Sequence, residues 1–280
     1  MRPLPRTLCT LPLFLLPAVA PDATTQTKFA VIGDYGDGPQ AGNVATLVKG
    51  QGIAFIATVG DNCYGSSPPI ATQVGNKYAS YVSSKTFWPS LGNHEYSDGC
   101  GGGSAKGYFA YFTLPGNERY YDFVVGPVHF FVVNSNSQEP DGNTPTSKQA
   151  LWLKQKLRKA KQPWKIVYFH HPAFSSGYHG STKVMQWPFE TWGASLVLSG
   201  HDHDYERILR DDNHDGKKLT YIVDGEGGQP PRSFYTTVSG SVVRYNSGNG
   251  ALFVTATSTS LQLQFKNTGG TVIDSVTLTK

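Results

Sequence analysis

Five apolar runs recur through the first two hundred residues, and each run ends in polar residues that can bind a metal ion. The runs cover residues 29–33, 53–59, 90–91, 165–169 and 195–199. Short apolar runs bounded by glycine, asparagine or aspartate are typical of buried β-strands. Because open α/β sheets collect their chemistry at the carboxyl ends of strands, we expect the polar residues after these runs to converge on one site.

Helical patterns separate these runs. We expect helices at residues 43–49, 73–83 and 147–161, and the third has the clearest apolar stripe. Thr146 or Ser147 can cap that third helix at its amino end. The alternation of strands and helices predicts a mixed α/β region.

The rest of the chain has strand patterns. Residues 119–125 and 128–134, joined by a Gly-Pro pair, predict a β-hairpin, and a β-meander is expected after Arg207. No repeat and no linker marks a second domain, so we expect one α/β domain, residues 28–280, in which two sheets pack face to face with helices outside. The meander strands are expected at residues 219–223, 241–245, 251–257, 261–265 and 272–278.

Residues 1–20 predict a cleaved signal peptide, with a basic start, an apolar stretch at residues 8–19 and a small-residue cleavage site at Ala20. Cleavage after Ala23 is the alternative. An uncleaved anchor is the rival interpretation, although the apolar stretch is short and broken by proline. We therefore expect a secreted protein, periplasmic if the source is bacterial, with no membrane association after cleavage.

The composition fits a secreted globular domain. Hydrophobic residues make up 39% of the chain and charged residues only 16%, which favours a protein rich in polar loops. Two of the 24 basic residues, Arg2 and Arg6, leave with the signal peptide, so the net charge falls from +4 to +2. We expect no nucleic-acid surface, and no partner protein is evident.

Two cysteines remain after Cys9 leaves with the signal peptide. Cys63 and Cys100 both stand in loops beside the polar residues that follow the strands. In an oxidising compartment such a pair often forms a disulfide, and we expect one here. Two separate thiols are the alternative, because the sequence does not give the distance between the two Cα atoms.

The polar residues after the strands have the chemistry of a two-metal site. His201 and His203 stand two apart, so in extended backbone both imidazoles would face the same way and could serve two metal ions. For that pair taken alone, solvated loop histidines are the alternative. A bound phenolate would indicate a strongly Lewis-acidic ion such as Fe(III). The other expected ligands are Asp61 as a bridge, with Asp34, Tyr64, Asn93 and His170.

Together these motifs resemble the five blocks of the purple acid phosphatases, a branch of the calcineurin-like metallophosphoesterases. Position 36 is glycine where most of that superfamily has histidine, and Tyr64 is the tyrosine that marks the purple branch. The resemblance runs from about residue 29 to residue 228. It implies a four-layer α/β/β/α sandwich of two mixed β-sheets, of the small type that lacks the extra amino-terminal domain of larger plant enzymes. The blocks are Asp34-x-Gly36, Gly60-Asp61-x-x-Tyr64, Gly92-Asn93-His94-Glu95, His170 and Gly200-His201-x-His203.

The resemblance also implies the roles of the site residues. Asn93, His94 and His179 would bind the phosphate substrate, and His94 or His179 would protonate the leaving group. His171 would point to the opposite face of an extended strand, so we expect it to pack or to support the site. The implied ligands are Asp34, Asp61, Tyr64 and His203 for a ferric ion, and Asp61, Asn93, His170 and His201 for zinc, iron or manganese.

The implied reaction is the hydrolysis of small phosphate monoesters at acidic pH, by attack of a metal-bound hydroxide on phosphorus. A phosphodiesterase or nucleotide hydrolase on the same metal ions is the first alternative. A secreted protein that binds phosphate without catalysis is the second, and it is less expected because no ligand of the motif is missing.

Overall fold

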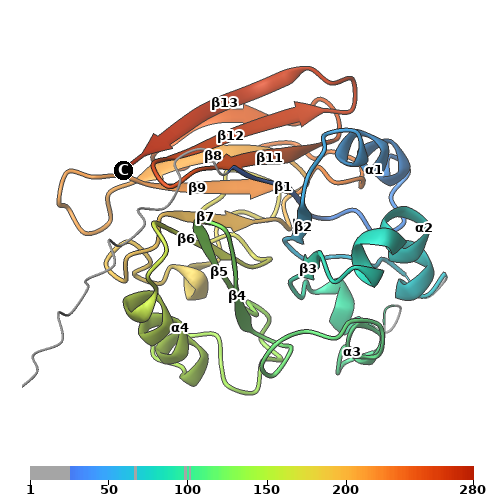
Figure 1. The fold of residues 1–280 in the computed structure, drawn as a ribbon, viewed down its shortest axis with the longest axis horizontal. Coiled ribbons are helices and arrows are strands. Elements are labelled where there is room, and N and C mark those ends of the chain that lie inside the picture. Colours follow the sequence, from blue (N-terminus) through green and yellow to red (C-terminus); the bar gives the residue numbers. More distant parts are fainter. Residues whose placement is uncertain (1–25, 66–67, 98–99, 101) are drawn as a thin grey trace, which may run out of the picture.

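Two β-sheets packed face to face, with helices on their outer faces, form the expected four-layer sandwich (Figure 1). The computed structural model describes residues 26–280, apart from residues 66–67, 98–99 and 101. The expected signal peptide lies outside the described residues. In the part of the chain that is described, no helix has the length and apolar character needed to span a membrane.

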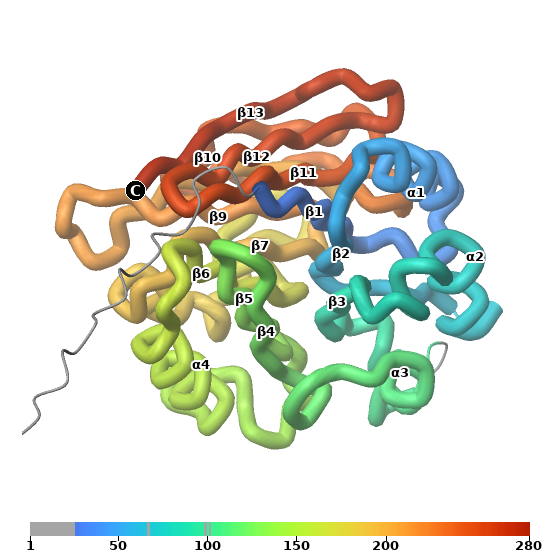
Figure 2. Tube along the Cα trace, viewed as in Figure 1, coloured from blue at the N-terminus to red at the C-terminus, as the bar shows by residue number. Residues whose placement is uncertain are grey.

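The first sheet combines the beginning and the end of the domain. Its strands are β1 (Thr27–Ile32), β2 (Phe55–Thr58), β3 (Phe87–Pro89), β11 (Gly250–Ala256), β12 (Ser260–Asn267) and β13 (Val272–Thr279). Their order is β13-β12-β11-β1-β2-β3. β1 pairs in parallel with β2 and antiparallel with β11, and Figure 2 shows these segments side by side although they are far apart in the sequence.

The second sheet is built from the middle of the chain. Its strands are β4 (Tyr121–Val125), β5 (Val128–Val132), β6 (Trp164–Tyr168), β7 (Leu196–Ser199), β8 (Tyr205–Arg210), β9 (Leu219–Asp224) and β10 (Ser241–Tyr245). Their order is β10-β8-β9-β7-β6-β5-β4. β4 and β5 form the expected hairpin, and β5, β6, β7 and β9 run in parallel.

Apolar side chains fill all three spaces between the layers. Phe29, Phe55 and Phe130 lie between the two sheets with stacked or edge-to-face rings and almost no exposure. The outer face of the first sheet packs against α1 (Ala41–Lys49), α2 (Ile70–Ser83) and α3 (Lys106–Tyr111). The outer face of the second packs against α4 (Lys148–Lys159), whose first turn is capped by the Ser147 side chain.

Several details differ from the sequence-based expectation. The strands after Arg207 do not form one meander, because β9 and β10 join the second sheet while β11, β12 and β13 join the first. β8 and α3 were not predicted, since β8 carries polar residues of the fifth motif and α3 is only six residues long. Leu151, one of the apolar residues of the helix predicted at residues 147–161, is 51% exposed and does not belong to the buried stripe of α4. Periodicity gives the existence of a strand but not its partner, which depends on long-range pairing.

Candidate metal centre

The carboxyl ends of five strands meet at one end of the sandwich. Asp34 follows β1, Asp61 follows β2, Asn93 follows β3, His170 follows β6 and His201 follows β7. The first sheet therefore contributes three loops, and the second sheet two loops, to the same end of the sandwich. The prediction that the runs converge is confirmed by the contacts among these side chains.

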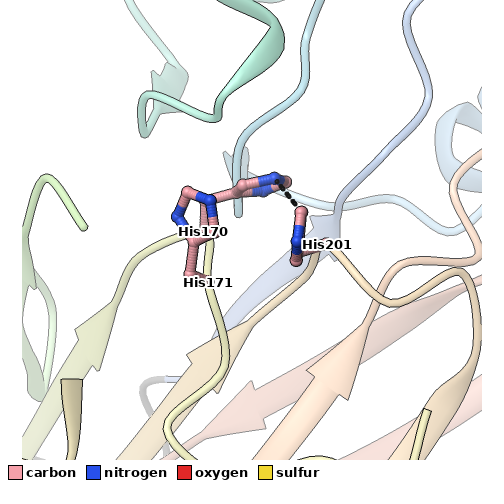
Figure 3. A group of neighbouring side chains, drawn as sticks. All are labelled: His170, His171 and His201. Atoms are coloured by element: carbon pink, nitrogen blue, oxygen red, sulfur yellow. Dashed lines mark hydrogen bonds between the residues drawn. The ribbon is translucent and has the colours of Figure 1, made fainter. Parts of the chain in front are cut away.

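His170 is the centre of the first group of donor atoms. Its Nδ1 lies 2.9 Å from the carbonyl oxygen of Val59, to which it must donate, so Nε2 faces the site. Around Nε2 lie Asn93 Oδ1 at 3.0 Å, His201 Nδ1 at 3.1 Å and Asp61 Oδ2 at 3.3 Å. Figure 3 shows the His170 and His201 rings turned toward each other. A proton on Nε2 satisfies one of these contacts, whereas a cation accepts lone pairs from all four atoms.

A second group of donor atoms adjoins the first. Tyr64 Oη lies 3.2 Å from Asp34 Oδ1 and 3.3 Å from His203 Nε2, while His203 Nδ1 lies 3.1 Å from the carbonyl oxygen of Pro230. The Nε2 of His203 therefore faces the site, as the Nε2 of His170 does. Asp34, Asp61 and His170 offer ligand atoms within 4.8 Å of one another, so Asp61 lies between the two groups. This arrangement fits two neighbouring cations that share one carboxylate.

The backbone of the ligand loops is strained. Asp34, Asp61 and His201 have φ angles of 55°, 50° and 71°, a left-handed conformation that residues with side chains rarely adopt. Gly60 and Gly200 precede two of these residues, and a Cβ atom there would collide with the His170 ring and with Asp34 Oδ2. Strain of this kind persists only where surrounding contacts enforce it, and it concentrates at functional sites.

Glu95 supplies contacts that enforce this loop geometry. Its buried carboxylate accepts hydrogen bonds from the backbone N–H groups of Gly92, Asp61, Asn62 and Cys63, at 2.6 to 3.2 Å. One side chain thus ties the loop after β2 to the loop after β3. This role of Glu95 was not predicted, although Glu95 belongs to the Gly-Asn-His-Glu motif and its position there was the available signal.

Burial and neighbouring charges set the ionisation of the donor groups. Burial raises the pKa of Tyr64 well above its usual value, and Asp61 and Asp34 raise it further. Burial disfavours a charged His170, but Asp61 and Asp34 outweigh it and raise the pKa of His170 to about 10. Burial, together with His170, lowers the pKa of His201. A phenol in this environment ionises only beside a strong Lewis acid.

Two further histidines, His94 and His179, lie beside these donor groups with side chains that are partly or largely exposed. The His94 ring lies 4.1 Å from the Tyr64 ring between centroids, its Nε2 is 3.9 Å from Asp61 Oδ2, and its side chain is 36% exposed. The His179 ring stacks on His201 with 4.2 Å between centroids. Both rings are thus placed beside the donor atoms, on side chains that solvent can reach.

Two expectations about histidine orientation are wrong. His201 and His203 do not reach the site through extended backbone, because His201 is left-handed and residues 201–204 lie in bends. His171 does not point away from the site, since its ring lies 4.5 Å from the His201 ring between centroids (Figure 3). His171 Nδ1 is 2.8 Å from the Ser135 hydroxyl, so this residue contacts a ligand ring from the side.

A disulfide joins the two loop cysteines. Cys63 and Cys100 are bonded, and their Cα atoms are 5.8 Å apart. Cys63 lies between Asp61 and Tyr64 in the sequence, in the loop after β2, and its N–H also donates to Glu95. The bond therefore ties the loop after β2 to the segment that leads into α3.

Family comparison assigns the chain to a class. The model of the calcineurin-like phosphoesterase family matches residues 27–205, which is more than half of the chain. The chain belongs to that family. The matched region includes all the proposed ligand residues.

Individual relatives indicate one branch of the family. Human tartrate-resistant acid phosphatase type 5 is 25% identical, over 86% of this chain and 86% of that protein. Purple acid phosphatase 17 of Arabidopsis thaliana is 24% identical, over 88% of this chain and 82% of that protein. The expected resemblance to purple acid phosphatases is confirmed, and the expected enzyme class, phosphoric monoester hydrolase, agrees with these names.

A solved structure confirms the fold. The purple acid phosphatase from yellow lupin (Lupinus luteus) seeds aligns with a TM-score of 0.76 and 19% identity. The alignment covers 91% of this chain and 54% of the lupin chain. The four-layer sandwich of two mixed sheets is therefore shared with that structure.

Proposed function

We propose that this protein is a secreted acid phosphatase that hydrolyses small phosphate monoesters at a dinuclear metal centre. The observation that supports it most strongly is the convergence of three acceptor atoms, one each from Asn93, Asp61 and His201, on His170 Nε2. Hydrogen bonding explains only one of these contacts, because His170 Nε2 carries at most one proton and the carboxylate and amide oxygens carry none. The expected signal peptide at residues 1–20 supports secretion.

The donor set suits two different ions. Asp34, Tyr64 and His203 offer two anionic oxygens and one imidazole, which fit Fe(III), with Asp61 as the shared ligand. Asn93, His170 and His201 offer a neutral oxygen and two imidazoles, which fit a divalent zinc, iron or manganese ion. Such a pair of ions would supply a nucleophile from water and neutralise the charge of the phosphate.

The chain's own residues supply binding and proton transfer. Asn93 and His94 follow β3 side by side, so one loop presents both a ligand and a phosphate-binding group. His94 is partly exposed beside Asp61, and it is the residue we assign as the general acid for the leaving group. His179 lies against His201 and is assigned to substrate binding on the other side.

Replacement of the bridging carboxylate tests the proposal. We expect Asp61→Ala to lose both ions, because it removes the ligand that they share. Without the ions that would supply the nucleophile, kcat/KM for 4-nitrophenyl phosphate should fall by about a thousandfold or more. Elemental analysis and a visible spectrum of the purified protein measure the ions, and a violet colour would indicate iron bound to tyrosinate. Asp37→Ala is the matched control, because Asp37 lies in the loop after β1 with a 53% exposed side chain.

Two results would contradict the proposal. Activity that survives the loss of both ions would exclude metal-dependent catalysis. Faster hydrolysis of bis(4-nitrophenyl) phosphate than of the monoester would instead favour a phosphodiesterase on the same residues.

A further inference from the structure

Arg232 reaches the site from a loop between β9 and β10 that lies outside the predicted motifs. Its Nη1 lies 2.6 Å from His179 Nε2, and its guanidinium lies over the Tyr178 ring, 4.9 Å from the centroid. His179 in turn stacks on His201, a proposed metal ligand. Only the His179 side chain therefore separates Arg232 from the proposed ligand His201.

The backbone around Arg232 is tied to the metal centre. The Arg232 N–H donates to the His203 carbonyl oxygen at 2.9 Å, and the Asn246 side chain donates to the Arg232 carbonyl oxygen at 2.9 Å. Two residues earlier, the Pro230 carbonyl oxygen accepts from His203 Nδ1. These contacts fix the origin of the Arg232 side chain relative to a proposed ligand, so its position is set by the fold.

The charge of Arg232 lacks a counter-ion within the described residues. Every ion pair described in residues 26–280 involves other side chains. Because a guanidinium stays protonated, it must donate to His179 Nε2, and most of its five N–H groups remain available. The unpaired N–H groups of Arg232 would bind an anion more strongly than a neutral group, because charge-assisted hydrogen bonds are the stronger ones.

We propose that Arg232 binds a second anionic group of the substrate, beyond the phosphate that is hydrolysed. It thereby selects phosphate monoesters whose leaving group carries a carboxylate or a further phosphate. The planar fork of the guanidinium matches the two oxygens of such a group, and the Tyr178 ring holds its plane. This inference rests on the proposed function, because it names the substrates of the same site.

A pair of matched substrates isolates this contribution. Phenyl phosphate and 4-carboxyphenyl phosphate differ only in the second anionic group. We expect Arg232→Gln to lower the ratio of kcat/KM for the carboxylated over the plain substrate by about tenfold or more, mostly through KM, because a charge-assisted hydrogen bond is lost. Arg232→Lys keeps the charge without the fork and is expected to recover part of the ratio.

Arg244→Gln is the matched control. Arg244 also lies over an aromatic ring, that of Phe234 at 5.6 Å, but its hydrogen bond goes to Thr237 and it contacts no histidine of the site. The substrate ratio should stay at the wild-type value in this variant. An equal loss for both substrates in Arg232→Gln would overturn the inference, because Arg232 would then serve the hydrolysed phosphate or His179 alone. An unchanged ratio would overturn it as well.

Calorimetry keeps this inference separate from the proposed function. If the wild-type protein hydrolyses neither compound, the acid phosphatase proposal fails. Titration of both compounds into metal-loaded wild type and Arg232→Gln then measures the same contribution as a difference in Kd. A tenfold preference for the carboxylated compound that disappears in Arg232→Gln would support the anion subsite, and equal affinities would overturn it.

Discussion

The inter-sheet core and the loop end of the same strands follow opposite physical rules. In the core, Phe29, Phe55 and Phe130 pack as stacked or edge-to-face rings with almost no exposure. A few residues further along β1 and β2, buried Asp34 and Asp61 adopt left-handed backbone and face other acceptor atoms. The core stabilises the fold by burial of apolar surface, whereas the ligand loops have strained backbone that brings several lone pairs close together.

The largest change in stability should come from the core. We expect Phe130→Ala to lower the free energy of unfolding by about 3–5 kcal/mol, because a buried phenylalanine is lost and a cavity remains. Urea denaturation measures the change. Val124→Ala is the control, since Val124 is 48% exposed on β4, in the same sheet. Equal losses in the two variants would show that the inter-sheet core does not dominate stability.

A change at the loop end should affect stability less and metal binding more. We expect Glu95→Gln to cost about 1–3 kcal/mol, because an amide nitrogen would face N–H groups that now donate to a carboxylate. Loss of a residue that orients ligand loops should weaken metal retention about 10- to 100-fold. Equilibrium dialysis against a chelator measures the second effect.

Glu118→Gln is the control for Glu95→Gln. Glu118 accepts a single N–H bond, from Leu114, in a loop before β4. It should change neither metal retention nor the urea midpoint by a comparable amount. If both variants keep their ions equally well, Glu95 does not organise the ligand loops.

The sequence predicted the core strands and the ligand candidates for the same reason. Asp34 and His170 follow an apolar run directly and Asp61 follows one after a single glycine, so local pattern alone placed them at strand ends. Sheet membership could not be predicted, because β11 pairs with β1 across more than two hundred residues. The contacts of Glu95 with the loop after β2, and of Arg232 with His179, are also long-range. His201 combines left-handed backbone with an N–H bond to Asp34, a contact across more than a hundred residues that no local pattern encodes.

The smallest expected effect lies outside both regions, at the start of α4 on the outer face of the second sheet. The Ser147 side chain accepts a hydrogen bond from the Ala150 N–H at 3.2 Å, so Ser147→Ala should cost about 1 kcal/mol of unfolding free energy. Thr146→Ala is the control, because exposed Thr146 was the alternative cap in the sequence and does not cap the helix in the structure. Neither variant should change kcat/KM for 4-nitrophenyl phosphate, since the apolar side of α4 packs on the outer face of the second sheet, away from the inter-sheet core. A loss of activity in Ser147→Ala that exceeds its loss of folded protein would show that the outer layer does influence the loop end, and the separation between stabilising and functional regions would then be wrong.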